Sequence, residues 1–301
     1  MKEEDIIECV NHSFNGKFDD YAVYDFYFNR NKIDCDIYVK DVNADDRIIV
    51  ENIRDIIYDD DYISVIQKGV KWDISKQPHA IISGRTGSGN TTFLSSLMLQ
   101  SFYKKHEVYL LDPKKEFAVF KNFHNKVYSS KIDIMRALKE IGQIIEQREF
   151  EISEHIKNEN EEFSLTAKDI GLKPIIIYFD EVSAIVSSLD SKEKKEFDSY
   201  LLGRSLGICL VIGLQNAHSE TIKTAVRNQF YFRVLLGNST SEDIQFLFGN
   251  NKDTIEKTVP IRTGYFTLDS VTINPQVLYI TDLYKNKFNK IKYFKKIQNI
   301  V

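Results

Sequence analysis

The sequence contains no long hydrophobic run and no secretion signal. No stretch approaches the ~18 consecutive apolar residues that a membrane-spanning helix needs. The chain starts with the acidic segment MKEEDIIECV, which lacks the basic-then-apolar pattern of a signal peptide. We therefore expect a cytoplasmic protein that has no membrane span of its own and that reaches a membrane only through partners.

Cysteine and proline are also scarce. Cys9, Cys35 and Cys209 stand alone without a CxxC pair, which argues against a disulfide framework or a zinc site and fits a reducing cytoplasm. The chain has only 5 prolines and is rich in Ile, Lys, Asn, Tyr and Phe. Codons rich in A and T produce this bias, so the composition points to a low-GC bacterium or one of its mobile elements.

The net charge of -4 conceals an asymmetry. Residues 1–61 hold 17 Asp and Glu and 7 Lys and Arg, a balance of 7 - 17 = -10, so the remaining chain carries -4 + 10 = +6. The acidic segment is either a solvated domain surface or the part that nucleic acid avoids. On the second interpretation, nucleic acid would contact the basic remainder.

The chain divides by pattern into three parts. Residues 1–70 form an expected small acidic α/β domain, with strands at YAVYDFYF and CDIYVKDV and a helix at ADDRIIVENIRDIIYDDDY, residues 44–62. Residues 71–284 form the expected main domain. Residues 285–301 form a basic tail with six lysines. The tail either contacts DNA phosphates or forms a solvated amphipathic helix, and the spacing of its apolar residues favours the helix.

From His79 onward, strand patterns alternate with helix patterns. Strands are expected at HAIIS, EVYLLD, KPIIIYFDE, ICLVIGLQ, FYFRVLLG, TGYFTL and QVLYIT. An amphipathic helix is expected at TTFLSSLMLQSFYKK, further helices at KIDIMRALKEIGQIIEQREFEISEHIKN and KKEFDSYLLGRSLG, and a polar loop at Ile156–Asp169. This alternation predicts an α/β fold with a mainly parallel sheet and helices on both faces.

One segment carries a phosphate-binding pattern. The motif G-x-x-x-x-G-[K]-[ST] fits residues 84–91 at every position but one. Glycines let backbone N–H groups converge on phosphate oxygens, and the following helix adds its positive end. The hydroxyl at the [ST] position is placed to hold Mg²⁺. The sequence thus predicts a site for ATP and Mg²⁺ formed by Gly84, Arg85, Thr86, Gly87, Ser88, Gly89, Asn90, Thr91 and Thr92.

The exception is Asn90, which stands where the motif has lysine. That lysine offsets the charge that shifts between the β- and γ-phosphates during transfer. Asn90 is uncharged and too short to span the same distance, and loss of one such group costs roughly 10² to 10³ in rate. Binding by the loop N–H groups and Mg²⁺ can survive. Arg85 is the nearest spare cation, but its place at the start of the loop favours a side chain that faces solvent.

Two acids follow a buried strand about 90 residues later. Ligands of α/β sheets bind at the carboxyl ends of strands, where PIIIYFDE places Asp180 and Glu181. Asp180 suits a carboxylate linked to Mg²⁺, and Glu181 suits the residue that polarises the attacking water. Combined with the glycine loop, this pair predicts a nucleotide-hydrolysing site.

Five segments in order resemble the FtsK/SpoIIIE family of DNA translocases, in particular the coupling proteins of Gram-positive conjugative elements. They are QPHAIISGRTGSGNTTFL, LLDPKKEF with its D-P-K strand end, IIEQREFEI with its arginine-bearing run, IYFDEVSAI, and GRSLGICLVIGLQNAHSETIKTAVRNQFYFRVLLG. The resemblance covers residues 70 to 270. It implies a RecA-like motor that forms a ring, a hexamer in this family, around double-stranded DNA, with ATP sites between subunits.

The resemblance also implies residue roles. Gln215 matches the sensor glutamine that reports the state of the γ-phosphate. Arg227 and Arg233 lie where such rings present an arginine to the neighbour's ATP, although both equally fit arginines that pair with local acids. Asp112 and Lys114 match D-P-K and are expected to support the site without taking part in catalysis. A relaxase and membrane transfer proteins are the partners that the resemblance suggests.

Three departures qualify the resemblance: Asn90, the absence of a preceding membrane segment, and the absence of a following winged-helix domain. The first hypothesis is an ATP-driven DNA translocase or coupling motor whose hydrolysis is impaired at Asn90. The second is a pseudo-ATPase that binds nucleotide and DNA, or joins a ring, without turnover. A small-molecule kinase is disfavoured, because a kinase needs neither the D-P-K strand end nor a strand ending in Gln215.

Overall fold

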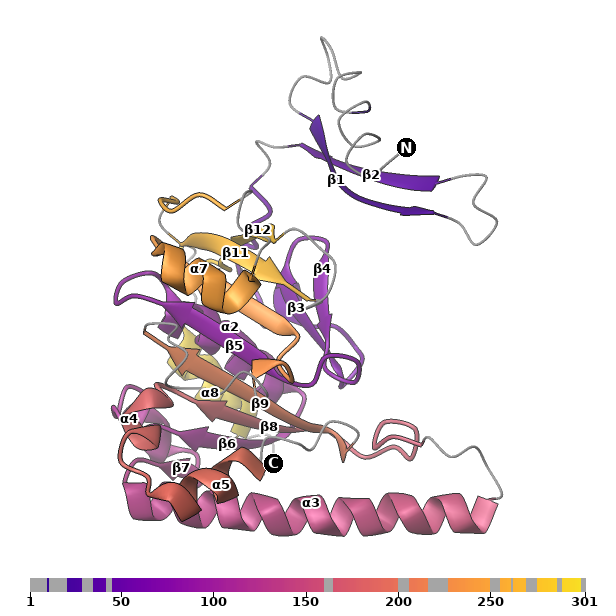
Figure 1. Cartoon of the computed structure of the whole chain (residues 1–301), viewed down its shortest axis with the longest axis vertical. Coiled ribbons are helices and arrows are strands. Elements are labelled where there is room, and N and C mark those ends of the chain that lie inside the picture. The colour runs from indigo at the N-terminus through magenta and orange to yellow at the C-terminus, as the bar shows by residue number, and fades with distance from the viewer. Residues whose placement is uncertain are drawn as a thin grey trace.

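The computed structural model describes residues 10, 21–28, 35–41, 45–159, 165–199, 206–215, 227–249, 255–260, 262–268, 275–285 and 289–298 (Figure 1). At the centre lies a sheet of β5 (Ala80–Gly84), β6 (Glu107–Leu111), β7 (Val127–Tyr128), β8 (Ile175–Phe179), β9 (Ile208–Leu214), β10 (Phe232–Leu236), β11 (Thr263–Thr267) and β12 (Gln276–Tyr279). The strand order is β12-β11-β10-β5-β9-β8-β6-β7. All seven strand segments predicted from His79 onward are strands of this sheet.

The sheet is mainly parallel, as the alternating pattern predicts. The strands from β10 to β7 run parallel, and β11 and β12 extend the other edge in antiparallel pairing. The strand β9 lies between β5 and β8. Because the three strands are parallel, the glycine loop after β5 and the acids after β8 reach the same edge of the sheet. The end of β9 lies between them.

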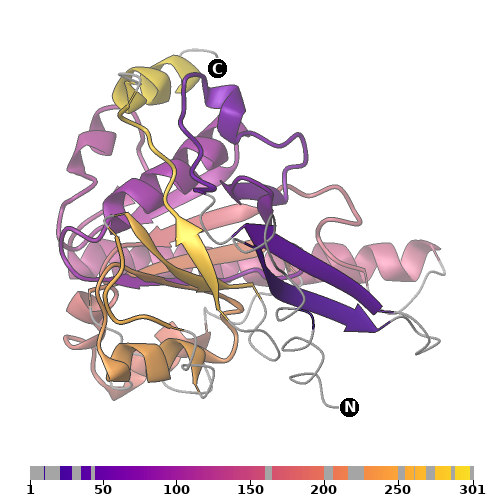
Figure 2. The same cartoon turned by 90° about the horizontal axis from the view of Figure 1, so that it is seen from above.

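Helices cover both faces of the sheet, as predicted. One face carries α2 (Asn90–Tyr103) and α8 (Lys290–Gln298), and the other carries α3 (Lys131–Glu159), α4 (Ser183–Val186), α5 (Ser191–Ser199) and α7 (Ser241–Phe248). Figure 2 shows α8 beside α2 and α7 on the far side of the strands. Within β8, Ile176 and Tyr178 join the core around α2, while Ile177 and Phe179 join the other core. This explains why β8 is apolar at every position.

The helix α2 is buried, so the prediction of an amphipathic helix is wrong. All residues of the range 93–102 are buried, because α8, the sheet and the preceding elements enclose the helix. Its serines tolerate burial since their hydroxyls bond to the helix backbone, as Ser95 Oγ does by donating to the carbonyl oxygen of Thr91 at 2.6 Å. Phe294 of α8 lies with its ring centroid 5.4 Å from that of Phe102. Residues 290–298 of the tail thus form the favoured amphipathic helix.

The predicted helix over residues 44–62 is also wrong for the described residues 45–62. Ile49 forms a parallel β-bridge with Asp282, and only the 3₁₀ turn η2 (Ile53–Ile56) is helical. Asn52 and Asp55 form a capping box around that turn. The backbone before it is extended because the Val50 N–H donates to the carbonyl oxygen of Asp282 at 3.0 Å. A partner more than 200 residues away in the chain therefore overrides the local helical spacing.

The other amino-terminal elements are strands. The strands β1 (Tyr21–Phe28) and β2 (Cys35–Asp41) form at the two predicted segments and pair as a separate two-stranded ribbon (Figure 1). The hairpin of β3 (Ile63–Gln67) and β4 (Val70–Asp73) spans the predicted boundary at residue 70. Ile66 and Trp72 of this hairpin join the core around α2. The division at residue 70 remains a prediction.

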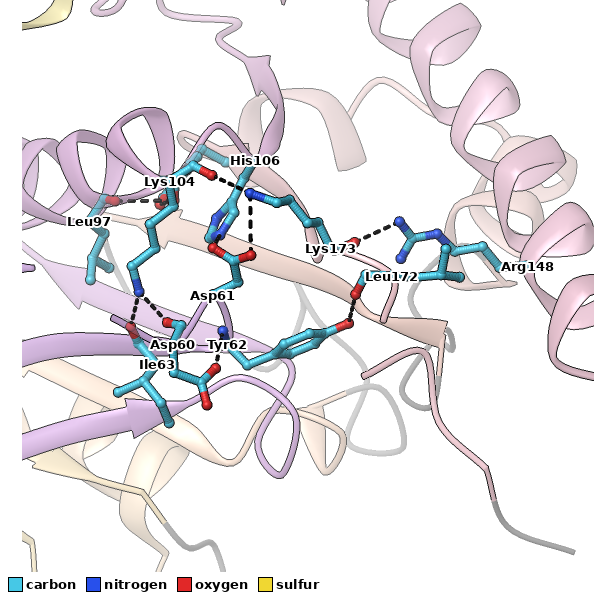
Figure 3. A network of polar contacts seen from close by, with 12 residues as sticks. Asp60, Asp61, Tyr62, Ile63, Leu97, Lys104, His106, Arg148, Leu172 and Lys173 are labelled. Atoms are coloured by element: carbon cyan, nitrogen blue, oxygen red, sulfur yellow. Dashed lines mark hydrogen bonds and ion pairs between the residues drawn. The ribbon is translucent and has the colours of Figure 1, made fainter. Parts of the chain in front are cut away.

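A polar network ties the segment before β3 to the end of the sheet opposite the glycine loop (Figure 3). The Lys104 ammonium donates to the carbonyl oxygen of Asp60 at 2.6 Å. The Lys173 ammonium lies 3.3 Å from the Asp61 carboxylate, and Arg148 donates to the carbonyl oxygen of Lys173 at 2.7 Å. The arginine of the IIEQREFEI run therefore has a structural contact that links α3 to this network.

Two predicted segments extend beyond the described ranges. The predicted polar loop at Ile156–Asp169 begins inside α3, which continues to Glu159, and its residues 160–164 lie outside the description. The predicted helix at residues 194–207 is described as α5 up to Ser199, and residues 200–205 lie outside the description. None of the helices in the described ranges is long and apolar enough to cross a membrane.

Candidate phosphate-binding site

The glycine loop connects β5 to α2 and has the geometry of a phosphate cradle. Gly87 and Gly89 have φ angles of 87° and 110°, a conformation that glycine adopts without strain. A Cβ atom on Gly89 would lie 2.5 Å from Cδ1 of Ile280. The helix α2 begins at Asn90, so its unpaired N–H groups and positive dipole end point toward the loop.

The loop borders a pocket of about 400 Å³ at the carboxyl edge of the sheet. Asp180, Glu181 and Gln215 line the same pocket, so the structure brings these predicted residues together with the loop. Of the predicted loop residues, the pocket is lined by Gly84, Arg85, Thr86, Gly87, Gly89, Asn90, Thr91 and Thr92. Ser88 faces a neighbouring cavity of about 320 Å³.

The Asn90 side chain points back into the loop, whereas the lysine of the motif would contact the phosphates in the pocket. Its side-chain amide donates to the carbonyl oxygen of Gly84 at 2.6 Å and lies 3.5 Å from the carbonyl oxygen of Leu214. Its Oδ1 atom is buried and has no hydrogen-bond partner. Asn90 therefore bridges the start of the loop and the end of β9, and it places no positive charge in the pocket.

The acids make the far wall of the pocket strongly negative. Burial raises the pKa of Asp180 to about 7, and the neighbouring carboxylates of Glu116, Asp112 and Glu181 add to the shift, while Lys114 opposes it. Burial and the neighbouring carboxylates therefore both disfavour a negative charge on Asp180. A divalent cation bound beside it would favour that charge.

Glu181 is fixed in position by several donors. The Nζ atom of Lys114 lies 3.2 Å from Oε2 of Glu181, and the backbone N–H of Gln215 donates to the same oxygen at 3.1 Å. The Ser183 hydroxyl donates to Oε1. Glu181 is buried and has a φ angle of 52°, which is uncommon for a residue other than glycine and marks a strained position.

The donors around Thr91 fit Mg²⁺. The Thr91 hydroxyl donates to Oε2 of Glu116 at 3.2 Å, and Asp180 lines the same pocket. Within the described residues, no group of three or more His, Cys, Asp or Glu side chains could hold a metal alone. Mg²⁺ is usually bound by one or two carboxylates together with substrate phosphates, and a hydroxyl and carboxylates around a phosphate loop suit that mode. Glu116 was not predicted, although it lies only four residues after Asp112 in the D-P-K segment.

The D-P-K segment forms a rigid turn beside the pocket. Asp112 is fully buried, and its two carboxylate oxygens accept from the backbone N–H groups of Glu116 and Phe117, both at 2.9 Å. This turn directs Lys114 and Glu116 into the pocket. The expected support by Asp112 is thus a backbone contact, whereas Lys114 itself lines the pocket.

The two predicted arginines lie outside the pocket lining. Arg233 is buried, and its guanidinium donates to the carbonyl oxygens of Phe230 at 2.8 Å and Leu247 at 2.9 Å. The Arg227 guanidinium lies 4.9 Å from the ring centre of Phe246. The structure therefore gives Arg233 structural contacts within its own chain, and a role toward a neighbouring subunit remains a prediction for both residues.

Arg262 is a pocket residue that the sequence did not indicate. It lines both cavities beside the loop, with its guanidinium 3.6 Å from the Asp282 carboxylate. It reaches the loop because β11 pairs antiparallel with β10, so that β11 starts at the carboxyl edge of the sheet and the residue before it lies there. Nothing in the local sequence signals that position.

Comparison with known proteins identifies a family and relatives of this chain. The model of the FtsK/SpoIIIE family matches residues 63–221. The FtsK domain-containing protein YdcQ of Bacillus subtilis strain 168 is 32% identical over 216 residues, which cover 66% of this chain and 44% of that protein. The DNA translocase FtsK of Caldanaerobacter subterraneus is 23% identical over 241 residues, which cover 73% of this chain and 34% of that protein. The chain spans less than half the length of these relatives.

Solved structures share the fold. The conjugation coupling protein TcpA of pCW3, in a monomer form with ATPγS, is similar with a TM-score of 0.66 at 16% identity, over 97% of this chain and 85% of that chain. The cytoplasmic domain of the type VII secretion ATPase EccC of Thermomonospora curvata gives a TM-score of 0.58 at 16% identity, over 79% of this chain and 31% of that chain. Since the family model spans more than half of the sequence, including the glycine loop, the D-P-K turn and both acids, the chain belongs to the FtsK/SpoIIIE family.

Proposed function

We propose that this chain is an ATP-dependent motor of double-stranded DNA, of the conjugative coupling type, whose hydrolysis is slowed by Asn90. The single observation that supports a nucleotide motor is the convergence of the glycine loop, Asp180, Glu181 and Gln215 on one pocket. A glycine loop alone binds phosphate. The addition of a metal-binding acid, a buried second acid and a strand-end glutamine gives the set that ATP hydrolysis needs.

Each residue of the pocket has a proposed task. The loop N–H groups and the α2 amino end bind the phosphates, and Thr91, Asp180 and Glu116 hold Mg²⁺. The metal neutralises phosphate charge when it is bound. Glu181 orients and polarises the attacking water, and Gln215 contacts the terminal phosphate from the end of β9.

Slow hydrolysis follows from Asn90. Its amide is engaged with Gly84 at 2.6 Å, so no side chain at position 90 offsets charge on the phosphates. The N–H groups of the loop remain available for binding. We therefore expect nucleotide binding of ordinary strength and turnover reduced by roughly 10² to 10³ relative to a lysine-containing loop.

One observation favours a second candidate, a pseudo-ATPase that binds nucleotide and DNA as a structural or regulatory ring subunit. The Glu181 carboxylate accepts from Lys114, from the Ser183 hydroxyl and from the Gln215 backbone N–H. A carboxylate engaged by this many donors has few oxygen lone pairs left to contact and orient an attacking water. In that case neither Asn90 nor Glu181 supports turnover.

Assembly and partners are part of the proposal. By the family's pattern, the chain forms a ring, a hexamer, around double-stranded DNA in the cytoplasm, and a relaxase and membrane transfer proteins recruit it. Arg227 is the better candidate for an arginine that faces a neighbour's ATP, because Arg233 is buried against carbonyl oxygens of its own chain.

The test is ATP hydrolysis with and without double-stranded DNA, for this chain beside Asn90→Lys. DNA-stimulated hydrolysis in Asn90→Lys, about 10² times faster or more than in the parent chain, supports the slowed motor. Asn90→Lys combined with Glu181→Gln is the matched control and should return to the basal rate. If the parent chain and Asn90→Lys both bind nucleotide and neither hydrolyses it, the result supports the pseudo-ATPase. Rapid hydrolysis by the parent chain contradicts the role assigned to Asn90.

A further inference from the structure

The pocket lacks the positive charge of the loop lysine, but other cationic side chains line it. Its far wall carries the carboxylates of Glu116, Asp180 and Glu181, and its near wall is the uncharged glycine loop. A polyphosphate that reaches from the loop toward those carboxylates adds more negative charge to this space. A positive side chain in addition to the Mg²⁺ proposed above would therefore strengthen binding of the phosphates beside the acids.

Among the described residues, three cationic side chains line the pocket: Arg85, Lys114 and Arg262. Arg85 is exposed at the start of the loop. Arg262 lies on the β12 side, 3.6 Å from Asp282 and with its guanidinium 5.4 Å from the ring centre of Tyr284. Lys114 alone among the three contacts an acid of the far wall, since its Nζ atom lies 3.2 Å from Oε2 of Glu181.

The ammonium of Lys114 has donors to spare. A lysine ammonium has three N–H donors, and Glu181 is the acceptor that Lys114 contacts within the described residues. Its side chain is 33% exposed, whereas that of Glu181 is 8% exposed. The ammonium thus lies between a buried carboxylate and the open pocket, with two donors left for an anion.

The turn before Lys114 makes this position reproducible. Both oxygens of the buried Asp112 carboxylate accept backbone N–H groups, those of Glu116 and Phe117. The same turn brings Glu116 to the Thr91 hydroxyl, at the first turn of α2. Lys114 therefore lies on a fixed turn whose Glu116 side chain contacts the first turn of α2, so only the Lys114 side chain needs to reorient.

From this arrangement we infer that Lys114 is a phosphate-binding residue that supplies, from the turn after β6, the positive charge that position 90 lacks. The inference rests on the proposed nucleotide site. Because Lys114 reaches the pocket from the acidic wall, it contacts the terminal phosphate of a triphosphate, at the end remote from the nucleoside. The same ammonium contacts Glu181, so the terminal phosphate and this acid share one cation.

The experiment compares affinities for ATPγS and ADP by titration calorimetry, with Mg²⁺, in the intact chain and in Lys114→Met. We expect Lys114→Met to weaken ATPγS binding about ten- to hundredfold and ADP binding much less, because ADP lacks the third (γ) phosphate that Lys114 would contact. Lys114→Arg keeps the charge and should lose about threefold or less. Lys115→Met removes the same charge from the adjacent exposed residue, which does not line the pocket, and is the matched control.

A second pair of variants tests whether Lys114 substitutes for the lysine. With Asn90→Lys in place, Lys114→Met should weaken ATPγS binding by much less than in the parent chain, because the loop then supplies its own charge. The inference is overturned if Lys114→Met changes both affinities equally, or if its effect is the same in both backgrounds. If the parent chain, Lys115→Met and Asn90→Lys all bind neither nucleotide, the proposed function itself fails, and Lys114 has no phosphate to bind.

Discussion

The side-chain amide of Asn90 donates to the carbonyl oxygen of Gly84 across 2.6 Å and so joins the two ends of the phosphate loop. The residue that removes the lysine charge thereby also closes the loop on itself. This hydrogen bond stabilises the loop without a ligand. A lysine at position 90 has a longer side chain and would not place its donor at the same point.

This contact predicts an order of stability among variants at position 90. Asn90→Ala loses the donor and should lower the free energy of unfolding by about 1 kcal/mol. Asn90→Asp should lower it further, because a carboxylate cannot donate to the Gly84 carbonyl oxygen and instead repels it. Urea denaturation at pH 8 measures both values. An Asn90→Asp protein as stable as the parent would contradict the assigned hydrogen bond.

The glycines of the loop predict a contrast between two similar substitutions. Gly87→Ala meets no atom within 4 Å, so its cost comes only from the positive φ angle and should be about 1 kcal/mol. Gly89→Ala has the same kind of backbone cost and in addition places its Cβ atom 2.5 Å from Cδ1 of the buried Ile280. We expect Gly89→Ala to lower the melting temperature more than Gly87→Ala. Equal melting temperatures would mean that Ile280 moves aside freely.

The raised pKa of Asp180 predicts that the contribution of this carboxyl group to the free energy of unfolding falls as pH rises. Its folded-state pKa of about 7 lies above the ordinary 3.8, so ionisation in the folded protein is unfavourable between these values. The cost is absent below pH 3.8 and fully present above pH 7. Without Mg²⁺ or nucleotide, Asp180→Asn should therefore be more stable than the parent by about 2 to 4 kcal/mol at pH 8, with a smaller difference at pH 5.

Urea denaturation at pH 5 and pH 8 tests this prediction, with Asp133→Asn as the control. Asp133 is a carboxylate in the first turn of α3 and does not line the pocket. The idea fails if Asp180→Asn is no more stable than the parent at pH 8, or if the difference does not change with pH.

The buried imidazole of His106 predicts a pH dependence of the opposite sign, in which the free energy of unfolding falls as pH falls. Burial and the nearby ammonium groups of Lys104 and Lys173 lower the pKa of His106 from 6.5 to about 4, against the attraction of Asp61. Neutral His106 is thus compatible with the fold above pH 6.5, and stability is lost as pH falls from 6.5 toward 4. By pH 5 the loss should be about 2 kcal/mol, and His106→Gln should remove this part of the pH dependence. Unfolding at pH 7, 6 and 5 gives the two slopes, and equal slopes would refute the assignment.

The buried guanidinium of Arg233 predicts a structural effect. Arg233→Met would leave the carbonyl oxygens of Phe230 and Leu247 without their donors and should lower stability by about 3 kcal/mol. Arg227→Met, which loses a contact with the Phe246 ring, should cost about 1 kcal/mol or less. Thermal unfolding ranks the two variants. An Arg233→Met protein with parental stability but without DNA-stimulated hydrolysis in the Asn90→Lys background would instead support a role for Arg233 toward a neighbouring subunit.

The sequence alone predicted every strand of the sheet except the two-residue β7, and it predicted the loop of the candidate site. Strands such as β5 and β8 are short apolar runs that end in glycine or acids, so their signal is local. The glycine loop with Asp180 and Glu181 followed from the same local signals, because parallel strands bring their carboxyl ends to one edge. The predicted amphipathic character of α2 failed, since burial on all sides depends on α8 and on the hairpin β3–β4 packing against it.

The missed parts of the site depend on contacts between distant segments. Glu116 enters the pocket because the turn at Asp112 folds toward α2, and Arg262 enters because the antiparallel strand β11 starts at the carboxyl edge of the sheet. The extended backbone at Ile49 likewise depends on Asp282. The periodicity of apolar residues within a segment contains no information on such distant partners. The helix predicted over residues 44–62 from local spacing was therefore wrong.

The complete burial of α2 bears on how the chain can change over evolutionary time. The helix that supports the loop is anchored along ten residues by the sheet, by α8 and by the hairpin β3–β4, and these anchors do not involve the side chain at position 90. Folding and turnover therefore place separate demands on the sequence. A single codon change at position 90 can remove or restore the positive charge of the loop while the scaffold stays intact, so the charge of the loop is free to vary in descent.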